Sequence, residues 1–340
     1  MTPATLLSKA RGLRINAMSR VQTIRITGED AGMRLDRWFR QRFPDIGHGH
    51  LQKLLRTGQV RVNGGRVKSG ARLEEGQSIR IPPLKVDASS QPEAQKEKAK
   101  PTISKADAKD LRSRVLHRDD DIIILNKPSG LAVQGGSRLK RNLDAMLDAL
   151  RFGKEDKPRL VHRLDKDTSG VLLLARHALA ARALTKAFRD KEVRKIYWAV
   201  VVGVPNPEEG IIDLSLAKQP GAGGEKVVAG TPGGKSAETR YRTVDQAGGR
   251  ASWLEFEPLT GRTHQLRVHA AALGTPILGD GKYGRRKAFL DNENIAGRLH
   301  LHARGLRFPH PAGHVMEIVA PMPEHIKRTF KILGFDAGGA

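Results

Sequence analysis

Apolar residues near the start of the chain recur with the spacing of a helix. Leu35, Trp38, Phe39 and Phe43 fall at i, i+3, i+4 and i+8, which predicts an amphipathic helix with one buried face. Leucines at positions 51, 54 and 55 predict a second short helix that ends near Gly58. Two short helices this close together indicate a small module at the front of the chain.

The next segment, residues 59–67, has the pattern of a β-hairpin. Polar and apolar residues alternate through Gln59-Val60-Arg61-Val62, and Arg66-Val67 follows the turn dipeptide Asn63-Gly64. An Asn-Gly pair between alternating residues is a strong hairpin signal, because both residues tolerate the positive φ of a tight turn. We therefore predict a separate α/β module over residues 21–85.

Residues 107–335 predict a larger domain that mixes strands and helices. Apolar runs predict strands at 122–125, 171–175, 197–202, 239–244, 253–258 and 315–320. Helical patterns fall at about 141–151, 178–191, 262–273 and 323–333. The elements follow no strict βαβ rhythm, so the predicted fold class is α+β, with a mixed, largely antiparallel sheet and flanking helices.

Two polar segments flank the front module. Residues 1–20 carry four basic residues and no acid, which predicts a disordered basic tail; a true start at Met18 or an organelle transit peptide are the alternatives. Residues 86–106 are polar and rich in lysine, with no apolar period, which predicts a flexible linker.

The charge balance points to a polyanionic partner. The 340 residues hold 60 Lys and Arg against 36 Asp and Glu, a formal net charge of +24. Nucleic acid is the simplest such partner, and no basic amphipathic run is long enough to favour a membrane surface. Residues 33–85 alone hold twelve basic and four acidic residues, which favours RNA over a module that contacts nothing in particular. The candidate RNA contacts there are Arg34, Arg37, Lys53, Arg56, Arg61 and Arg66.

Other classes of protein are excluded by what the sequence lacks. It has no cysteine, which excludes a disulfide scaffold, a thiolate nucleophile and any cysteine-based metal centre, and fits a reducing compartment. We therefore expect a cytoplasmic protein, with organellar import through residues 1–20 as the minor alternative. The longest apolar runs are too short to cross a bilayer. The histidines match no familiar zinc spacing, so we expect no metal site.

Two dense polar clusters lie in the second domain. The first is His162-Arg163-Leu164-Asp165-Lys166-Asp167-Thr168-Ser169-Gly170, a charged turn before an apolar strand, where a rigid scaffold commonly presents a site. The second runs from Thr260 to His269. A helix starting near Arg262 would point Arg267 inward, and an inward arginine needs a carboxylate, for which Asp165 is the candidate. An exposed basic helix is the alternative.

These clusters, together with Asn126-Lys127-Pro128-Ser129-Gly130, resemble the RluA-type family of RNA pseudouridine synthases. The three motifs come in the family's order, with a matching Lys195-x-Tyr197 strand between them, and cover roughly residues 110–330. The front module is similar to the S-four RNA-binding domain in its elements Arg34-Leu35-Asp36-x-x-Phe39 and Gly58-x-Val60-x-Val62-Asn63-Gly64. It departs from that domain at positions 48 and 50, where histidines replace the usual Ser-Arg pair and a further arginine.

The resemblance implies a reaction, a substrate and a set of residues. It implies isomerisation of uridine to pseudouridine, most simply in large-subunit (23S) rRNA, without a cofactor. Asp165 would be the catalytic carboxylate, Arg267 its partner, and Tyr197 the residue that stacks on the base. Arg163 would fill the gap left by a flipped uridine. The further candidate substrate contacts are His162, Leu266, Arg262, Lys127 and Thr168.

Alternatives remain at this point. A tRNA-directed or dual-specificity synthase would carry the same motifs. A protein of another class, an RNA-binding ribosome-assembly factor with an inactive synthase fold, would be expected to have lost Asp165, Tyr197 or Arg267. We expect a monomer, and the motifs do not identify which uridines are modified.

Overall fold

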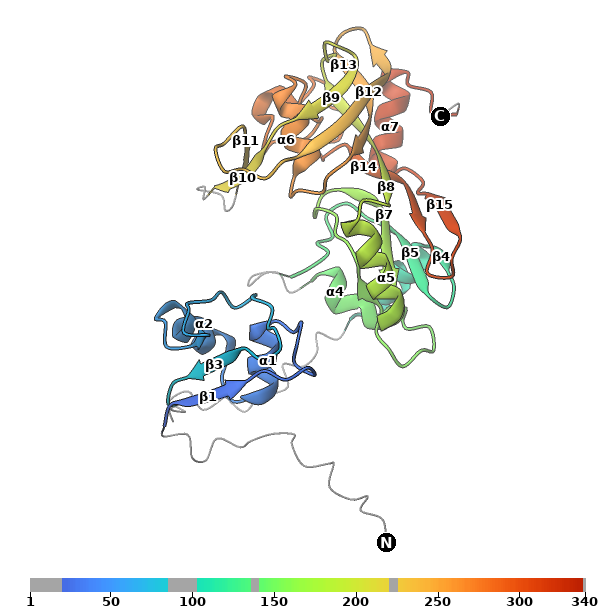
Figure 1. The fold of residues 1–340 in the computed structure, drawn as a ribbon. Helices are drawn as coiled ribbons and strands as arrows, with labels where there is room; N and C mark the ends of the chain where they lie inside the picture. Colours follow the sequence, from blue (N-terminus) through green and yellow to red (C-terminus); the bar gives the residue numbers. More distant parts are fainter. Residues whose placement is uncertain (1–19, 85–102, 136–140, 220–225, 339–340) are drawn as a thin grey trace. The chain divides into compact units, whose positions relative to one another are not determined.

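The computed structural model describes residues 20–84, 103–135, 141–219 and 226–338, and divides the chain into two compact units. The first unit is Met1–Lys100 and the second is Pro101–Ala340 (Figure 1). A helix, α3, begins at Lys105, so the second unit starts inside the range predicted as linker.

The first unit packs two short helices against a small sheet. Its elements are β1 (Gln22–Arg25), α1 (Leu35–Arg42), α2 (His48–Arg56), β2 (Arg61–Val62) and β3 (Ser78–Ile81), with strand order β1-β3-β2. The helices form where the apolar spacing predicts them. Trp38, Phe39 and Phe43 are buried together, with the two phenylalanine rings 4.8 Å apart.

The predicted hairpin over residues 59–67 is wrong beyond its turn. Asn63 and Gly64 do adopt positive φ, but the returning chain makes a single bridge, between Val62 and Gly65. The strand β2 pairs instead with β3, where Val62 lies opposite the fully buried Ile79. A more distant apolar strand thus provides the better partner, which a local pattern does not predict.

The second unit is built on one ten-stranded sheet. Its strands run in the order β4-β5-β7-β14-β8-β13-β12-β9, with β15 on β14 and β6 on β7; β10 and β11 form a separate pair. All pairs are antiparallel except β7 with β14, which confirms the predicted mixed, largely antiparallel sheet. The strands are β4 (Val115–Arg118), β5 (Ile122–Lys127), β6 (Arg159–Leu160), β7 (Ser169–Ala175), β8 (Arg194–Val202), β9 (Glu209–Asp213), β10 (Leu216–Gln219), β11 (Lys226–Ala229), β12 (Glu238–Ala247), β13 (Ala251–Pro258), β14 (Leu301–Pro309) and β15 (Val315–Val319).

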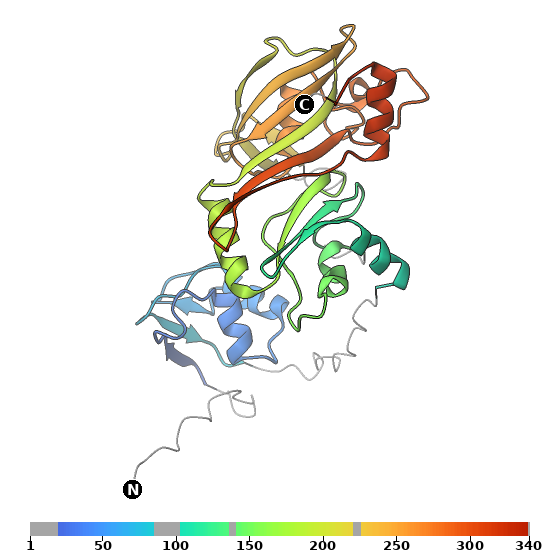
Figure 2. The same ribbon diagram turned by 90° about the vertical axis from the view of Figure 1, so that its right-hand side faces the viewer.

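Helices cover both faces of this sheet (Figures 1 and 2). On the β5–β7 part, α5 packs on one face and α3 with η2 on the other. On the β8–β13 part, α6 packs on one face and α7 on the other. These helices are α3 (Lys105–Ser113), α4 (Leu143–Met146), the 3₁₀ turn η2 (Leu147–Leu150), α5 (Ala178–Arg189), α6 (Gln265–Ala272), the 3₁₀ turn η3 (Arg285–Ala288) and α7 (Glu324–Leu333).

The strand β14 lies at the centre of the sheet and was not predicted from the sequence. Its apolar residues are interrupted by His302, Arg304 and Arg307, so it lacks the apolar run of a central strand. His302 is nevertheless fully buried, because one ring nitrogen bonds Ser169 Oγ (2.9 Å) and the other donates to the carbonyl of Ala320 (3.2 Å). Hydrogen bonds to buried polar groups therefore allow this strand to lie in the core although its sequence is not uniformly apolar.

Where β7 and β14 meet, the backbones approach too closely for a side chain. Gly170 has φ +113, and a Cβ there would lie 2.2 Å from the carbonyl oxygen of Ala303. Only two register pairs join the two strands. Gly170 thereby fixes the loop before β7 against the centre of the sheet. None of the helices in the described ranges is long and apolar enough to cross a membrane.

Candidate active site

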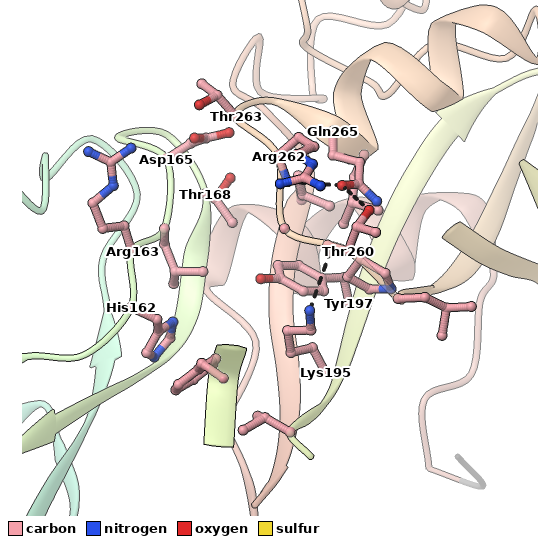
Figure 3. Close-up of a pocket in the computed structure, with 18 of the residues that line it drawn as sticks. His162, Arg163, Asp165, Thr168, Lys195, Tyr197, Thr260, Arg262, Thr263 and Gln265 are labelled. Atoms are coloured by element: carbon pink, nitrogen blue, oxygen red, sulfur yellow. Dashed lines mark hydrogen bonds between the residues drawn. The ribbon is translucent and has the colours of Figure 1, made fainter. Parts of the chain in front are cut away.

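A cavity of about 1090 Å³ opens in the second unit where two of the predicted clusters meet. The loop with Asp165 forms one wall, and the segment from β13 into α6 forms the other (Figure 3). Tyr197 and Lys195 of β8 line it between these walls. Its volume is slightly above the roughly 300–1,000 Å³ usual for ligand pockets, so it has room for a nucleotide.

The Asp165 loop is held from behind by the run Asn126-Lys127-Pro128-Ser129-Gly130. The Gly130 N–H donates to the carbonyl of Lys166 (2.9 Å), and Ser129 Oγ donates to that of Asp167 (2.8 Å). The third sequence motif therefore acts on the site through the loop's backbone.

Lys127 does not line the cavity, which corrects the prediction that it contacts substrate. The side chain is 1% exposed, and Nζ donates to the carbonyls of Pro128, Leu131 and Lys166 at 2.8–3.0 Å. All three donors of the ammonium are thus used inside the protein. Burial lowers the pKa of Lys127 to about 7, although Asp167 and Asp165 partly offset that effect. Lys127 positions the loop.

His162 lines the cavity as a neutral, fixed ring. The Leu173 N–H donates to His162 Nε2 (2.9 Å), and the ring stacks on Phe188 with centroids 4.5 Å apart. Burial, together with the charge of Lys195, lowers the pKa of His162 to about 3. The ring therefore offers substrate a neutral surface.

Asp165 and Arg267 both line the cavity, but they are not an ion pair. Arg267 donates from Nε and Nη2 to the two carboxylate oxygens of Asp280, each at 2.7 Å, which corrects the predicted pairing. The Asp165 side chain is 28% exposed, and within the described residues the one basic side-chain nitrogen at ion-pair distance from it is His264 Nε2, at 4.0 Å. Although burial lowers the pKa of Arg267, Asp280 and, more weakly, Asp165 raise it overall.

Tyr197 lies below Asp165 in the cavity (Figure 3). Burial, helped by the negative charge of Asp165, raises the pKa of the phenol. Tyr197 is therefore protonated at neutral pH and presents a ring face and one O–H donor to a bound base.

The helix α6 begins three residues later than predicted, at Gln265, because that side chain organises the turn before it. Its Oε1 accepts from the Arg262 N–H (2.9 Å) and Thr260 Oγ1 (2.7 Å), and its Nε2 donates to the carbonyl of Glu238 (2.9 Å). His264 takes a left-handed φ of 55 just ahead of the helix. A glutamine side chain that braces the preceding turn in this way leaves no periodic signal in the sequence.

The remaining predicted contacts differ in exposure. Arg163 is exposed on the rim and donates to Gln134 Oε1 (3.1 Å), and Arg262 is exposed with Nε on the carbonyl of Ser236 (2.9 Å). Thr168 and Leu266 are buried at the wall, 2% and 6% exposed. All four line the cavity.

Asp280 and Tyr283 are site residues that the sequence did not reveal. Asp280 anchors Arg267, and Tyr283 OH lies 2.6 Å from Nδ1 of His264. Both come from a segment without regular structure and without a sequence motif. Their contribution to the site is visible only from their contacts with Arg267 and His264. Burial, which outweighs the neighbouring charge of Asp165, lowers the pKa of His264.

The basic residues predicted to bind RNA in the first unit are all exposed. Lys53 and Arg56 of α2 line a groove of about 580 Å³ together with Lys68. Arg34 pairs with Asp36, and Arg61 donates to the carbonyls of Gly58 (3.0 Å) and Gly64 (3.2 Å). Arg37 and Arg66 complete the set.

A second polar cluster lies outside the cavity. Asp119, Asp121 and His310 place one ligand-type atom each within 4.8 Å of one another. Asp119 Oδ2, however, already contacts His117 Nε2 (2.7 Å) and His310 Nε2 (3.1 Å), and the buried Arg176 donates to the Asp119 carbonyl. A guanidinium this close opposes a cation, so we interpret the cluster as a network that joins β4 to the end of β14.

Comparison with known proteins identifies the family. Residues 121–272 match the model of the RNA pseudouridylate synthase family. The chain is 39% identical over 92% of its length to the ribosomal large subunit pseudouridine synthase C of Escherichia coli K12, of which it covers 97%. The chain belongs to the RNA pseudouridylate synthase family. It is an RNA pseudouridine synthase, as the resemblance in its motifs predicted.

Further relatives agree. Ribosomal large subunit pseudouridine synthase C of Vibrio cholerae is 38% identical, over 92% of this chain and 96% of that protein. Among solved structures, human RNA pseudouridylate synthase domain containing 4 aligns with a TM-score of 0.56 and 30% identity, over 67% of this chain and 95% of that one. The fold of the second unit is thus that of a pseudouridine synthase.

Proposed function

We propose that this chain isomerises specific uridines of large-subunit rRNA to pseudouridine, with Asp165 as the catalytic carboxylate. The observation that carries the proposal is the position of Asp165 on a braced loop at the cavity, above Tyr197, without a hydrogen-bonded cation among the described residues. A carboxylate kept free in this way is available to a substrate. The names of the relatives support large-subunit rRNA as the target.

The reaction breaks the bond between N1 of uracil and C1′ of ribose, turns the base and joins C5 to C1′. Asp165 stabilises the electron-poor C1′ once the base has left. Tyr197 stacks on the base and keeps its proton until the sugar or base needs one. Arg267, held by Asp280, adds a fixed positive charge to the wall near Asp165.

A uridine in folded RNA must leave its stack to reach this cavity. Arg163 is exposed on the rim and close to Asp165 in sequence, so we propose that its side chain fills the vacated place in the RNA. For the first unit we propose an S-four-type RNA-binding role, supported by its two packed helices, its Asn63-Gly64 turn and its exposed basic residues. We also propose a cytoplasmic monomer.

The test maps pseudouridine after incubating the full chain with three substrates: naked large-subunit rRNA, immature large ribosomal subunits and bulk tRNA. We expect new pseudouridines at a few positions of the rRNA or the immature subunit. Modification of tRNA alone would overturn the rRNA target, and no modification of any substrate would favour an RNA-binding assembly factor.

A further inference from the structure

Lys195 lies on the floor of the cavity, and the proposed reaction assigns it no role. It precedes Tyr197 by two residues on β8, so both side chains point to the same face of the strand. Both line the cavity, and Figure 3 shows the Lys195 ammonium below the Tyr197 ring, with a dashed line to Thr260. Lys195 therefore lies beside the residue expected to stack on the base.

Its ammonium is largely unused by the protein. Nζ makes one long hydrogen bond, 3.4 Å to the carbonyl of Thr260, and has no carboxylate at ion-pair distance within the described residues. Glu257, the acid that acts most strongly on it, is bonded by Arg194 at 3.1 and 3.3 Å. An ammonium has three donors, and a partly buried cation without partners is unfavourable unless a ligand completes it.

The other cations of the wall are committed or remote from the floor. Arg267 uses both ends of its fork on Asp280. The remaining basic residues that line the cavity are exposed: Arg163, Lys166, Arg189, Lys191, Arg194 and Arg262. Lys195 is thus the described cation that can meet the base itself.

The reaction calls for a cation at this place. When the N1–C1′ bond breaks, its electron pair stays on the base, and the uracil becomes an anion delocalised over N1, O2 and O4. A C5–C1′ bond then forms from the same electron pair, C5 gives up its proton and N1 takes one up, so that the atoms balance as an isomerisation. A donor placed where negative charge develops lowers the barrier.

We propose that Lys195 is a further catalytic residue, whose ammonium donates a hydrogen bond to a carbonyl oxygen of the uracil while the base is detached as an anion. This inference rests on the proposed function. In this scheme Asp165 stabilises the positive charge that develops on the sugar, and Lys195 stabilises the negative charge that develops on the base.

The proposed role of Lys195 also predicts how the reaction rate depends on pH, because only the protonated ammonium can donate. Burial lowers the pKa of Lys195 to about 8, Glu257 of β13 acts against this shift, and Lys191 ahead of β8 adds to it. His162, which also faces it, is neutral. The ammonium fraction therefore falls as the pH rises through about 8, and the rate should fall with it.

The experiment measures single-turnover pseudouridine formation by the full chain at saturating large-subunit rRNA. We expect Lys195→Met to lower the rate by about 100-fold with little change in RNA affinity, because one transition-state donor is lost. Lys195→Arg should retain most of the rate and lose its decline above about pH 8, since arginine stays charged. The matched control is Lys186→Met, at an exposed lysine of α5 paired with Asp190 outside the cavity.

Several outcomes would overturn the inference. One is a Lys195→Met rate equal to wild type; another is a loss confined to RNA affinity, which would make Lys195 a phosphate contact. A third is an unchanged alkaline decline in Lys195→Arg. Inactivity of the wild type would instead contradict the proposed function itself, and hydrogen exchange in β8 separates a folding defect from a catalytic one.

Discussion

The two units contain the same pair of side chains in opposite surroundings. Arg34 and Asp36 of the first unit form a fork, at 3.1 and 2.6 Å, with side chains 56% and 19% exposed. Arg267 and Asp280 of the second form an equivalent fork, at 2.7 Å twice, with side chains 9% and 1% exposed. The two pairs have the same hydrogen-bonding geometry, but the first is exposed to solvent and the second is buried.

This difference shows that the same kinds of charged residue act differently when they are exposed and when they are buried. Exposed charges are screened by water and salt, so those of the first unit fit the proposed attraction of RNA, which needs no fixed geometry. Buried charges act in a low dielectric, where position decides their effect. The cavity accordingly holds a few charges in fixed positions. Arg267 is bonded to Asp280, whereas Asp165 and Lys195 have few partners in the described part of the protein, as their proposed roles require.

The largest effect should follow from breaking the buried fork. Asp280→Asn leaves Arg267 buried without its partner, which should lower the free energy of unfolding by about 3–5 kcal/mol and reduce pseudouridine formation. Denaturant unfolding of the full chain measures this change. A stability within about 1 kcal/mol of wild type would show that the buried pair matters no more than an exposed one.

A smaller loss of the free energy of unfolding, of about a few kcal/mol, should appear when the pH is lowered. Burial lowers the pKa of His302 from 6.5 to about 4, so the unfolded chain binds a proton below about pH 6.5 that the folded chain refuses until about pH 4. Stability should therefore fall between these two pH values and level off below them. In denaturant titrations His302→Gln should have a shallower pH dependence; an identical one would assign the acid sensitivity to other groups.

The first unit should affect affinity and leave the chemistry unchanged. Replacing Lys53 and Arg56 by glutamine removes two exposed charges of the α2 groove. The slope of log affinity against log salt should fall by about 1–2, while the single-turnover rate at saturating RNA stays the same. Filter binding over a salt series measures the slope. A lower rate at saturation would place the first unit in the catalytic step.

The smallest effect should come from the exposed fork. Asp36→Asn removes the partner of Arg34, whose side chain is 56% exposed, so hydrogen exchange in α1 should stay close to wild type. Loss of protection through α1 would contradict the contrast with Asp280→Asn.

Sequence patterns predicted the parts of the molecule that depend on local periodicity or on contiguous motifs. The helices α1 and α5, the strands β5 and β8, and the loop with Asp165 all lie where apolar spacing or the motif indicated. Partners chosen across space were not predictable in the same way. Arg267 bonds Asp280 rather than Asp165, and β14 is a central strand because buried hydrogen bonds satisfy His302. Lys127 shows the limit of motif transfer: the motif was found, but the side chain is buried on backbone carbonyls and does not line the cavity.

The most direct test of the account compares tritium release from C5-labelled uridine in large-subunit rRNA by wild type and Asp165→Asn. The substitution keeps the size of the side chain and removes its charge. We predict release by the wild type, none above background by Asp165→Asn, and equal RNA binding by both. Release by Asp165→Asn at the wild-type rate would contradict the role of the carboxylate, and with it the division of charge across the cavity.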